Sequence, residues 1–325
     1  MDQIWGNTAQ YTEIVWGWQI AIYLFLAGLS AGAFISAILV KWRSNSLAGY
    51  DGIIKAGALI ALPAISLGLA LLVVDLGKPF SFWLLMFHFN LKSVMSIGVI
   101  LLSVYSGLMT VFAAIIFKKE LAENSLTSWA FRPFLFIVEW FEGLGRWFDW
   151  VMVVLAIGIA AYTGFLLSAL VAKPLLNVPV LPLLFLVSGI SSGVAGCIAV
   201  SVIFFKKSVQ DSNLKYLLSL DTKLIPTELF ILFVMFTGLF NMGGQYAIIG
   251  QQALTIGIWA KVFWGGIIGL GLIGPLLVIT FSLHQYEQSD HVPIPVGSLL
   301  INSGLVLTGV ILLRFYMLYA GQIFI

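Results

Sequence analysis

Long apolar runs separated by short polar connections dominate the chain. Eight of these runs are long enough, at about twenty residues, for a helix to cross the hydrocarbon layer of a membrane. They hold few charged side chains, and they lack the alternation of polar and apolar residues that barrel strands require. The predicted helices are Trp16–Val40, Ile53–Val74, Val94–Phe117, Val151–Val171, Leu181–Phe205, Glu228–Ile249, Ile258–Leu283 and Gly297–Ala320.

The composition agrees with this pattern. Of the 325 residues, 61% are apolar and only 9% are charged, and the mean hydropathy is +1.06. Such a chain needs lipid as its solvent, and backbone groups in lipid must form their hydrogen bonds within each segment. We therefore expect an all-α integral membrane protein. The first run has no basic residues before it and is longer than the apolar part of a signal peptide, so we expect it to be retained.

Basic residues predict the orientation of the helices, because cytoplasmic connections are enriched in lysine and arginine. The second, fourth and sixth connections carry only Lys78, Lys92 and Lys173. The odd-numbered connections, which are therefore predicted to be cytoplasmic, carry Lys41, Arg43, Lys118, Lys119, Arg132, Arg146, Lys206, Lys207, Lys215 and Lys223. Eight spans then place both termini outside. In the third connection, Glu139–Trp150 reads as an amphipathic helix at the membrane interface, most simply an anchor without chemistry.

An internal similarity divides the chain in two. Leu24–Ala33 is similar to Phe185–Val194, which begins 161 residues later, and both segments lie in spans that run from outside to inside. Four spans separate them, which indicates a parallel repeat of two four-helix bundles, residues 1–171 and 172–325. Small residues four apart let helices approach closely, so we interpret both copies as packing surfaces.

Cofactors that need several cysteine or histidine ligands are not expected. Cys197 is the only cysteine and falls inside the fifth span, where we interpret it as a small packing residue. Iron–sulfur ligation by this chain alone is therefore excluded. His88 is predicted near the outer face, and His284 and His291 near the cytoplasmic face. His88 cannot pair with His284 across the membrane, and His284 and His291 lie in or beside a polar loop, so haem is not expected. The same count of histidines excludes a three-histidine zinc site.

Polar side chains gather instead at the outer ends of the first bundle. They are Gln19 and Tyr23 on one face of the first helix, Asp75, His88, Asn90, and Tyr162 on the fourth helix. A quinone needs this kind of site, an apolar slot with a few donors and acceptors for its two oxygens. Taken singly, Gln19 and Tyr23 also fit interhelical hydrogen bonds or an interface aromatic belt. Their convergence with Asp75 favours a binding site.

Six ordered segments carry a family resemblance. They are IAIYLFLAGLSAG (Ile20–Gly32), DLGKPFSFW (Asp75–Trp83), MFHFNLKSVMSIG (Met86–Gly98), AYTGFLLSAL (Ala161–Leu170), LPLLFLVSGISSG (Leu181–Gly193) and LRFYMLYAGQ (Leu313–Gln322). Through them the chain resembles the NrfD/PsrC family of quinone-reactive membrane subunits over nearly its whole length. The fourth and last segments are most similar to the branch that serves formate-dependent nitrite reduction.

The resemblance implies two four-helix bundles and a menaquinol site near the outer face. It also implies an iron–sulfur subunit docked on that face, which accepts the electrons and passes them to a terminal reductase, and a location in the bacterial cytoplasmic membrane. The family's tyrosine on the fourth helix matches Tyr162. In the polysulfide-reductase branch an asparagine and a histidine stand near Gln19 and Tyr23, so this sequence departs there. Both replacements can still hydrogen-bond a quinone oxygen.

Oxidation of a quinol also needs a proton acceptor. Asp75 is the first candidate, as a partly buried carboxylate, and His88 is the second, because histidine titrates near neutrality. Lys78 is expected to hold Asp75 ionised or to meet a lipid phosphate. Arg314 is an intramembrane charge and therefore a candidate for binding the quinone, with a structural ion pair as the alternative. Glu228 opens the sixth predicted helix, where it favours the helix N-terminus or belongs to a proton route.

Two other functions remain open from the sequence. A secondary transporter would also have small-residue helix contacts and a parallel repeat, but no pair of spans is broken at mid-membrane and the midplane has almost no charge. A plain membrane anchor for a soluble enzyme would make the outer polar cluster dispensable. The terminal electron acceptor is not encoded in this chain.

Overall fold

The computed structural model describes residues 16–43, 51–76, 78–87, 90, 92–123, 128–206, 212–288 and 295–324. Within these ranges the chain is helical and contains no strand. Eight segments are long and apolar enough to cross a membrane, which confirms the predicted class. They are α1 (Trp18–Arg43), α2 (Gly52–Asp75), α3 (Val94–Ile116), α7 (Arg146–Ser168), α8 (Leu181–Phe205), α9 (Ser212–Met242), the segment Gly257–Ser282, and α13 (Val296–Ile323).

The seventh segment is composite. It begins as α11 (Gly257–Lys261), continues as the π-helix η4 (Val262–Ile273) and ends in α12 (Gly274–Gln288). Shorter elements lie between the spans: the 3₁₀-helix η2 (Pro79–Met86), α4 (Lys118–Glu123), α5 (Ser128–Phe131), η3 (Arg132–Phe134), α6 (Leu135–Gly143) and α10 (Gly244–Thr255).

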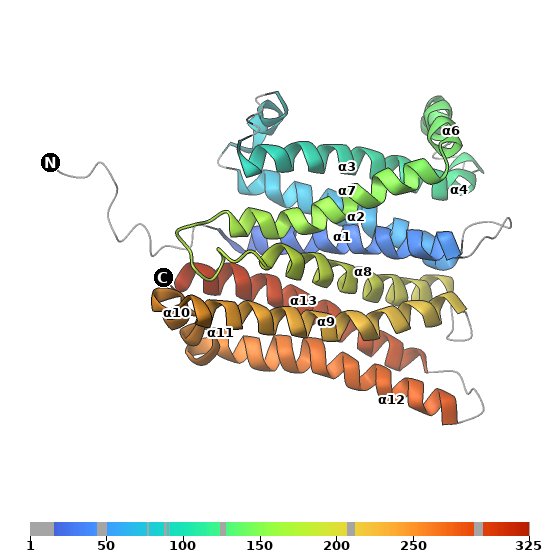
Figure 1. Ribbon diagram of the computed structural model, residues 1–325. Coiled ribbons are helices and arrows are strands. Elements are labelled where there is room, and N and C mark those ends of the chain that lie inside the picture. Colours follow the sequence, from blue (N-terminus) through green and yellow to red (C-terminus); the bar gives the residue numbers. More distant parts are fainter. Residues whose placement is uncertain are drawn as a thin grey trace.

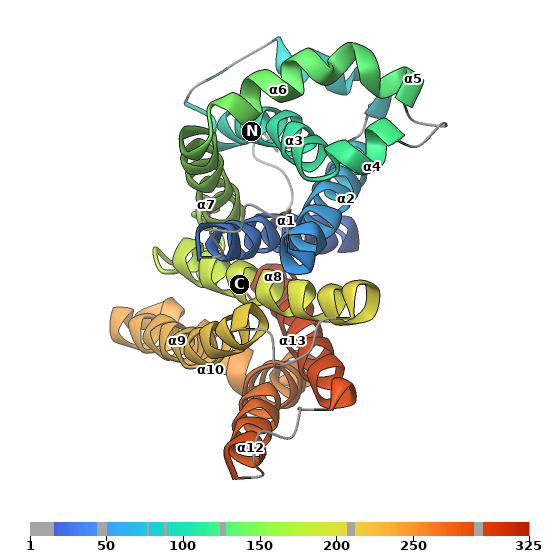
Figure 2. The same ribbon diagram turned by 90° about the vertical axis from the view of Figure 1, so that its right-hand side faces the viewer.

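The long helices run side by side (Figure 1). One end of the molecule carries η2, α10 and the last turn of α13, and we refer to it as the α10 end. The other end carries α4 and α6 and is the α6 end. In a view along the helices (Figure 2), α1, α2, α3 and α7 form one group, and α8, α9, α12 and α13 form the other. Helices α1 and α8 meet between the two groups.

Glycines make the contact between α1 and α8 close. A Cβ atom added to Gly32 would lie 2.0 Å from the carbonyl oxygen of Gly189, and one added to Gly193 would lie 2.0 Å from the carbonyl carbon of Gly32. Only glycine fits at such a distance, because the atoms in the way are backbone atoms of the facing helix. The packing role predicted for the two similar segments is therefore confirmed, and they pack against each other.

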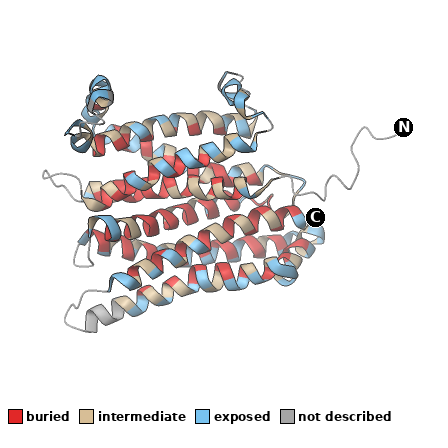
Figure 3. Ribbon diagram, turned by 180° about the vertical axis from the view of Figure 1, so that it is seen from behind, coloured by how far each residue is buried: buried red, intermediate tan, exposed pale blue. Residues whose placement is uncertain are grey.

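Burial follows this arrangement. The helices in the middle of the molecule are the most buried (Figure 3), and in α1 and α8 72% of the residues in the most apolar stretch are buried, against 33% in α2. Exposed apolar side chains cover the periphery, where Leu67, Phe233 and Phe281 are among the exposed ones. This is the distribution of a helical bundle whose outer surface faces lipid.

The predicted bounds of the sixth span are wrong. Helix α9 begins at Ser212 rather than at Glu228 and ends at Met242, after which Gly243 and Gly244 have positive φ angles of 70° and 53° and start α10. The polar segment before Glu228 had the composition of a loop. Its buried residues Leu214, Leu217, Leu218 and Asp221 nevertheless recur at helical spacing and pack inward.

The interfacial helix predicted for Glu139–Trp150 is also corrected. It is divided between α6, which ends at Gly143, and α7, which begins at Arg146. Gly145, with φ of 53°, makes the turn between them. Trp140 and Trp147 are exposed on the two helices, as an interfacial position requires. Lys118 at the start of α4 pairs with Glu139 and Glu142, and the hydrogen bond to Glu142 is the main reason that the pKa of Lys118 is raised.

Candidate functional site

Tyr23 and Tyr162 lie together inside the first group of helices. Tyr23 projects from α1 and is 1% exposed, and Tyr162 projects from α7 and is 8% exposed. The two side chains lie near enough for a charge on one phenol to disfavour a charge on the other. The structure therefore brings together two of the residues predicted from sequence.

The hydroxyl of Tyr23 is buried and has no hydrogen-bond partner among the described residues. Leaving a buried polar atom unpaired costs about 1 to 3 kcal/mol, so native proteins rarely do so without a reason. The other fully buried phenols are paired: Tyr105 lies 3.2 Å from the hydroxyl of Ser30, and Tyr316 donates to the carbonyl of Ala253 at 3.0 Å. The unpaired hydroxyl of Tyr23 is thus a specific feature of this position, and it is free to bond a ligand.

Glycines of the two neighbouring helices pack against the two phenols. The ring of Tyr23 packs on Gly68 of α2, where an added Cβ would lie 3.4 Å from Cδ2 of the ring. The ring of Tyr162 lies against Gly98 of α3. All four spans of the first group therefore contribute to the surroundings of the two hydroxyls.

Gln19 lies one turn before Tyr23 on α1 and is half-buried. Its side-chain oxygen turns back along the chain, because a Cβ added to Gly17 would lie 2.4 Å from it. In this conformation the amide lies beside the start of the helix.

The residues between α2 and α3 are more exposed than predicted. Asp75 ends α2 as an exposed residue, so its expected partial burial is not found in this chain. Lys78 is exposed too, and among the residues that the structure describes no ion pair joins it to Asp75. Asn90 accepts a hydrogen bond from the backbone nitrogen of Lys92 at 3.1 Å and so stabilises its own turn. His88 lies outside the described residues.

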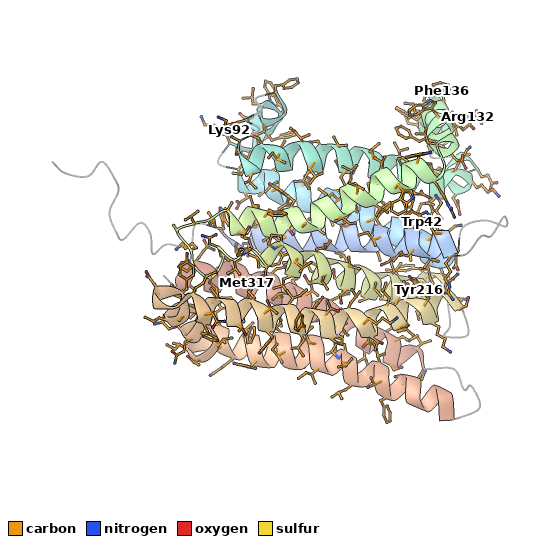
Figure 4. All side chains as sticks on the ribbon, in the orientation of Figure 1. Trp42, Lys92, Arg132, Phe136, Tyr216 and Met317 are labelled. Carbon is orange, nitrogen blue, oxygen red and sulfur yellow. The ribbon has the colours of Figure 1, made fainter. Side chains whose placement is uncertain are left out.

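Figure 4 shows at which end of the molecule several labelled side chains lie. Lys92 lies beside η2 at the α10 end, and Trp42, Arg132 and Tyr216 lie at the opposite end. At the α10 end, Phe80 and Phe87 of the segment around η2 are 94% and 73% exposed. This end therefore offers apolar surface and a lysine in the same connection as the carboxylate of Asp75.

Arg314 is fully buried, in the half of α13 that lies nearer the α10 end. Its Nη2 atom donates to the carbonyl of Phe185 at 3.1 Å and to the hydroxyl of Ser188 at 2.7 Å, and its guanidinium lies 3.7 Å from the centre of the Phe185 ring. Nη2 also lies close to Gly28 of α1. Arg314 thus joins α13 to α8 where the two groups of helices meet.

Two buried acids lie on the same side of α9. Asp221 accepts from Ser191 at 3.3 Å and from Asn302 at 3.5 Å, and Glu228 interacts electrostatically with both Asp221 and Arg314. One oxygen of Glu228 has no partner in the described ranges, and the residue borders a cavity of about 10 Å³, about the size of one water molecule. These groups form a buried polar cluster in the second group of helices.

Sequence reasoning missed Asp221, because the residues before Glu228 were interpreted as a loop. The spacing of seven residues from Asp221 to Glu228 was the available signal, since it places both acids on one face of a helix. Within the described part of the chain, no three histidine, cysteine or acidic side chains gather in a way that would hold a metal ion.

A set of hydrogen bonds fastens the start of α1 to the end of α13 at the α10 end. Gln322 accepts from the backbone nitrogen of Trp16 at 2.9 Å and donates to its carbonyl at 3.2 Å. Lys173, in the connection before α8, donates to the carbonyl of Gln322 at 3.0 Å. Burial lowers the pKa of Lys173. The helix that carries Tyr23 is thereby fixed to the second group of helices.

The family model described as "Polysulphide reductase, NrfD" matches residues 6–325. A polysulfide reductase component of Wolinella succinogenes is 46% identical over the full length of both proteins. Protein NrfD of Escherichia coli is 38% identical over 96% of each protein, and a selenate reductase component of Mesobacillus selenatarsenatis is 26% identical over 82% of this chain and 67% of its own length.

Proposed function

The chain belongs to the NrfD polysulphide reductase family, and from that premise we propose that it oxidises menaquinol as the membrane subunit of a bacterial anaerobic reductase complex. The relatives are named as parts of polysulfide and selenate reductases, which supports membership in a multi-subunit reductase. The chemical step assigned to this chain is the removal of two electrons and two protons from a quinol.

The observation that carries this proposal is the unpaired hydroxyl of Tyr23 beside Tyr162. A quinol headgroup has two oxygens that accept and donate hydrogen bonds, and a phenol hydroxyl suits either state. The pair lies among apolar side chains, as a quinone ring requires. Gln19 is the third proposed contact, from the turn of α1 before Tyr23.

The proton acceptor proposed first is Asp75, with His88 as the second candidate. Asp75 is exposed at the end of α2, at the same end of the molecule as α10, so a proton that it accepts can pass directly to water. The two electrons pass to an iron–sulfur subunit docked at this end, and from there to a terminal reductase. Lys78 is exposed three residues after Asp75 and is proposed to meet the quinone site, lipid phosphate or the docked subunit.

The α10 end is proposed to face the outside of the bacterial cytoplasmic membrane. The support is the concentration of lysine and arginine at the α6 end, which includes Lys41, Lys118 and Arg132. Residues 1–171 would then form the quinone-binding bundle and residues 172–325 the second bundle. A direct contact of Arg314 with the quinone stays a prediction, since its described contacts are to Phe185 and Ser188.

The test is the rate at which the assembled complex oxidises a short-tailed menaquinol analogue. Loss of one hydrogen bond costs about 1 kcal/mol, so Tyr162→Phe is expected to lower kcat/KM by about five- to tenfold. Tyr316→Phe is the matched control, because it also removes a buried hydroxyl but in the second group of helices. An assembled Tyr162→Phe complex with the wild-type rate would contradict a quinone site at Tyr23 and Tyr162.

A further inference from the structure

Gly98 is buried in α3, directly beneath the phenol of Tyr162. A Cβ atom added to Gly98 would lie 1.8 Å from the hydroxyl oxygen of Tyr162, 1.9 Å from Cζ and 2.6 Å from Cε1. Ordinary contacts between such atoms are about 3.5 Å or longer. The end of the ring therefore lies on the bare backbone of α3, in space that any other side chain would fill.

The close contact of Gly98 with Tyr162 is not repeated at Gly107 of α3 or at Gly158 of α7. Gly107, on the same helix, would have no atom within 4 Å of an added Cβ. Gly158, on the helix of Tyr162, would make an ordinary contact of 3.5 Å with Leu101 of α3. Between α3 and α7, a side chain would therefore fit at Gly158, whereas one at Gly98 would overlap the phenol of Tyr162.

The position of the ring decides where its hydroxyl points. Tyr162 lies near Tyr23, and a Cβ added to Gly68 of α2 would lie 3.4 Å from the ring of Tyr23, an ordinary contact. The two phenols come from α1 and α7, and each one packs against a glycine, Gly68 of α2 for Tyr23 and Gly98 of α3 for Tyr162. A methyl group at Gly98 would drive the phenol of Tyr162 either toward Tyr23 or out of line with it.

We infer that Gly98 is a positioning residue of the quinone site, which sets the place of the Tyr162 hydroxyl and thereby the width of the slot for a quinone headgroup. The inference rests on the proposed function. A headgroup held by both hydroxyls has a fixed distance between its two oxygens. If the hydroxyl of Tyr162 is displaced, only one of the two oxygens keeps its hydrogen bond. Even a small displacement lowers the reaction rate, because the bonded geometry must be kept during the reaction.

The experiment compares Gly98→Ala with Gly107→Ala in the assembled complex, with the menaquinol analogue as substrate. Both changes add a methyl group to α3 and favour the helix equally. Gly98→Ala is expected to lower kcat/KM at least as much as Tyr162→Phe, that is by about tenfold or more, mainly through a higher KM. Gly107→Ala is expected to stay within about twofold of wild type.

The same substitution in a chain that lacks the Tyr162 phenol distinguishes an effect on the position of Tyr162 from a general effect on helix packing. Tyr162→Leu removes the outer part of the ring, so Gly98→Ala should have no further effect on kcat/KM in that background. If Gly98→Ala alone prevents assembly, the double variant Gly98→Ala, Tyr162→Leu should restore it. An equal effect of Gly98→Ala in both backgrounds, or no restoration of assembly, would overturn the inference.

Different results would contradict the proposed quinone site and the proposed role of Gly98. A wild-type rate for Tyr162→Phe contradicts the quinone site itself. A reduced rate for Tyr162→Phe, combined with equal rates for Gly98→Ala and Gly107→Ala, contradicts only the role of Gly98.

Discussion

At the scale of single residues, the hydrogen bonds of the buried hydroxyls distinguish Tyr23 from the other fully buried tyrosines. Tyr105 and Tyr316 are as buried as Tyr23, but their hydroxyls have partners within the chain. Tyr23 has none in the described structure, and its neighbour is Tyr162. The sequence shows all four tyrosines as similar residues in apolar helices. Only the positions of their neighbours distinguish them.

The local surroundings of single residues also explain which site residues could be predicted from the sequence. Tyr23 and Tyr162 were predicted to lie together because each falls near the same end of its span. The burial of Asp75 was predicted wrongly, because it depends on how η2 leaves the end of α2. Asp221 was missed because a helix with polar residues on its inner side has the composition of a loop. Charge and hydropathy alone do not distinguish these cases.

Asp75→Asn tests the proposed proton acceptor. Asparagine keeps the size and hydrogen-bonding capacity of the side chain but cannot take up a proton, so turnover of the menaquinol analogue should fall by about a hundredfold or more. The affinity for the quinone should change little, because the hydroxyls of Tyr23 and Tyr162 remain. Steady-state rates and quinone binding of the assembled complex provide the two measurements.

Glu123→Gln is the control, since it neutralises an exposed carboxylate at the α6 end. Wild-type turnover of both the Asp75→Asn and the His88→Ala complexes would place the proton acceptor elsewhere. A bound water near Arg314 or an acid of the partner subunit would then be the next candidates.

At the scale of helices, local backbone geometry sets the bounds that composition leaves uncertain. Gly145 separates α6 from α7, and Gly243 and Gly244 separate α9 from α10, all with positive φ angles. Pro63 and Pro226, by contrast, lie inside α2 and α9 without ending them. The eight spans were predictable because apolar length is a strong signal. Their ends were less predictable, because glycine also occurs within spans as a packing residue, as at Gly32.

Gly32→Ala tests the contact between α1 and α8. The added methyl group would lie 2.0 Å from a backbone oxygen that cannot move independently of α8, so the helices must separate. Overpacking of this kind costs typically about 1 to 3 kcal/mol, and the midpoint of thermal unfolding in detergent should fall by several degrees. Gly304→Ala, where an added Cβ meets nothing within 4 Å, should leave the midpoint unchanged. Equal midpoints for the two variants would contradict the described contact.

At the scale of the whole molecule, the arrangement places the proposed quinone site in one group of helices and the buried polar cluster of Asp221, Glu228 and Arg314 in or beside the other. Helices α1 and α8 connect them, and Gln322 holds the start of α1 against α13. The division of the chain into residues 1–171 and 172–325 stays a prediction. The cross-contacts of α8 with α1, α2 and α7 were not predictable from one sequence, since they depend on helix rotation.

Labelling of introduced cysteines tests the proposed orientation. In a Cys197→Ala background, Lys92→Cys lies at the α10 end and Glu123→Cys at the α6 end, and both positions are exposed. An impermeant maleimide added to cells whose inner membrane is intact should label position 92 from the periplasmic side and reach position 123 only after that membrane is permeabilised. Labelling of position 123 but not position 92 in intact cells would show that the α6 end faces the periplasm. Equal labelling of both positions would contradict the assignment of the two ends to opposite sides of the membrane.

The central claim is that one quinone headgroup bonds Tyr23 inside the first group of helices. Equilibrium binding of a menaquinone analogue to the assembled complex in lipid nanodiscs tests it most directly. Tyr23→Phe removes only the hydroxyl that has no partner among the described residues, so the affinity should fall by about five- to tenfold while thermal stability stays equal or rises. An unchanged affinity in Tyr23→Phe, with one analogue still bound per chain, would place the quinone elsewhere and contradict the account.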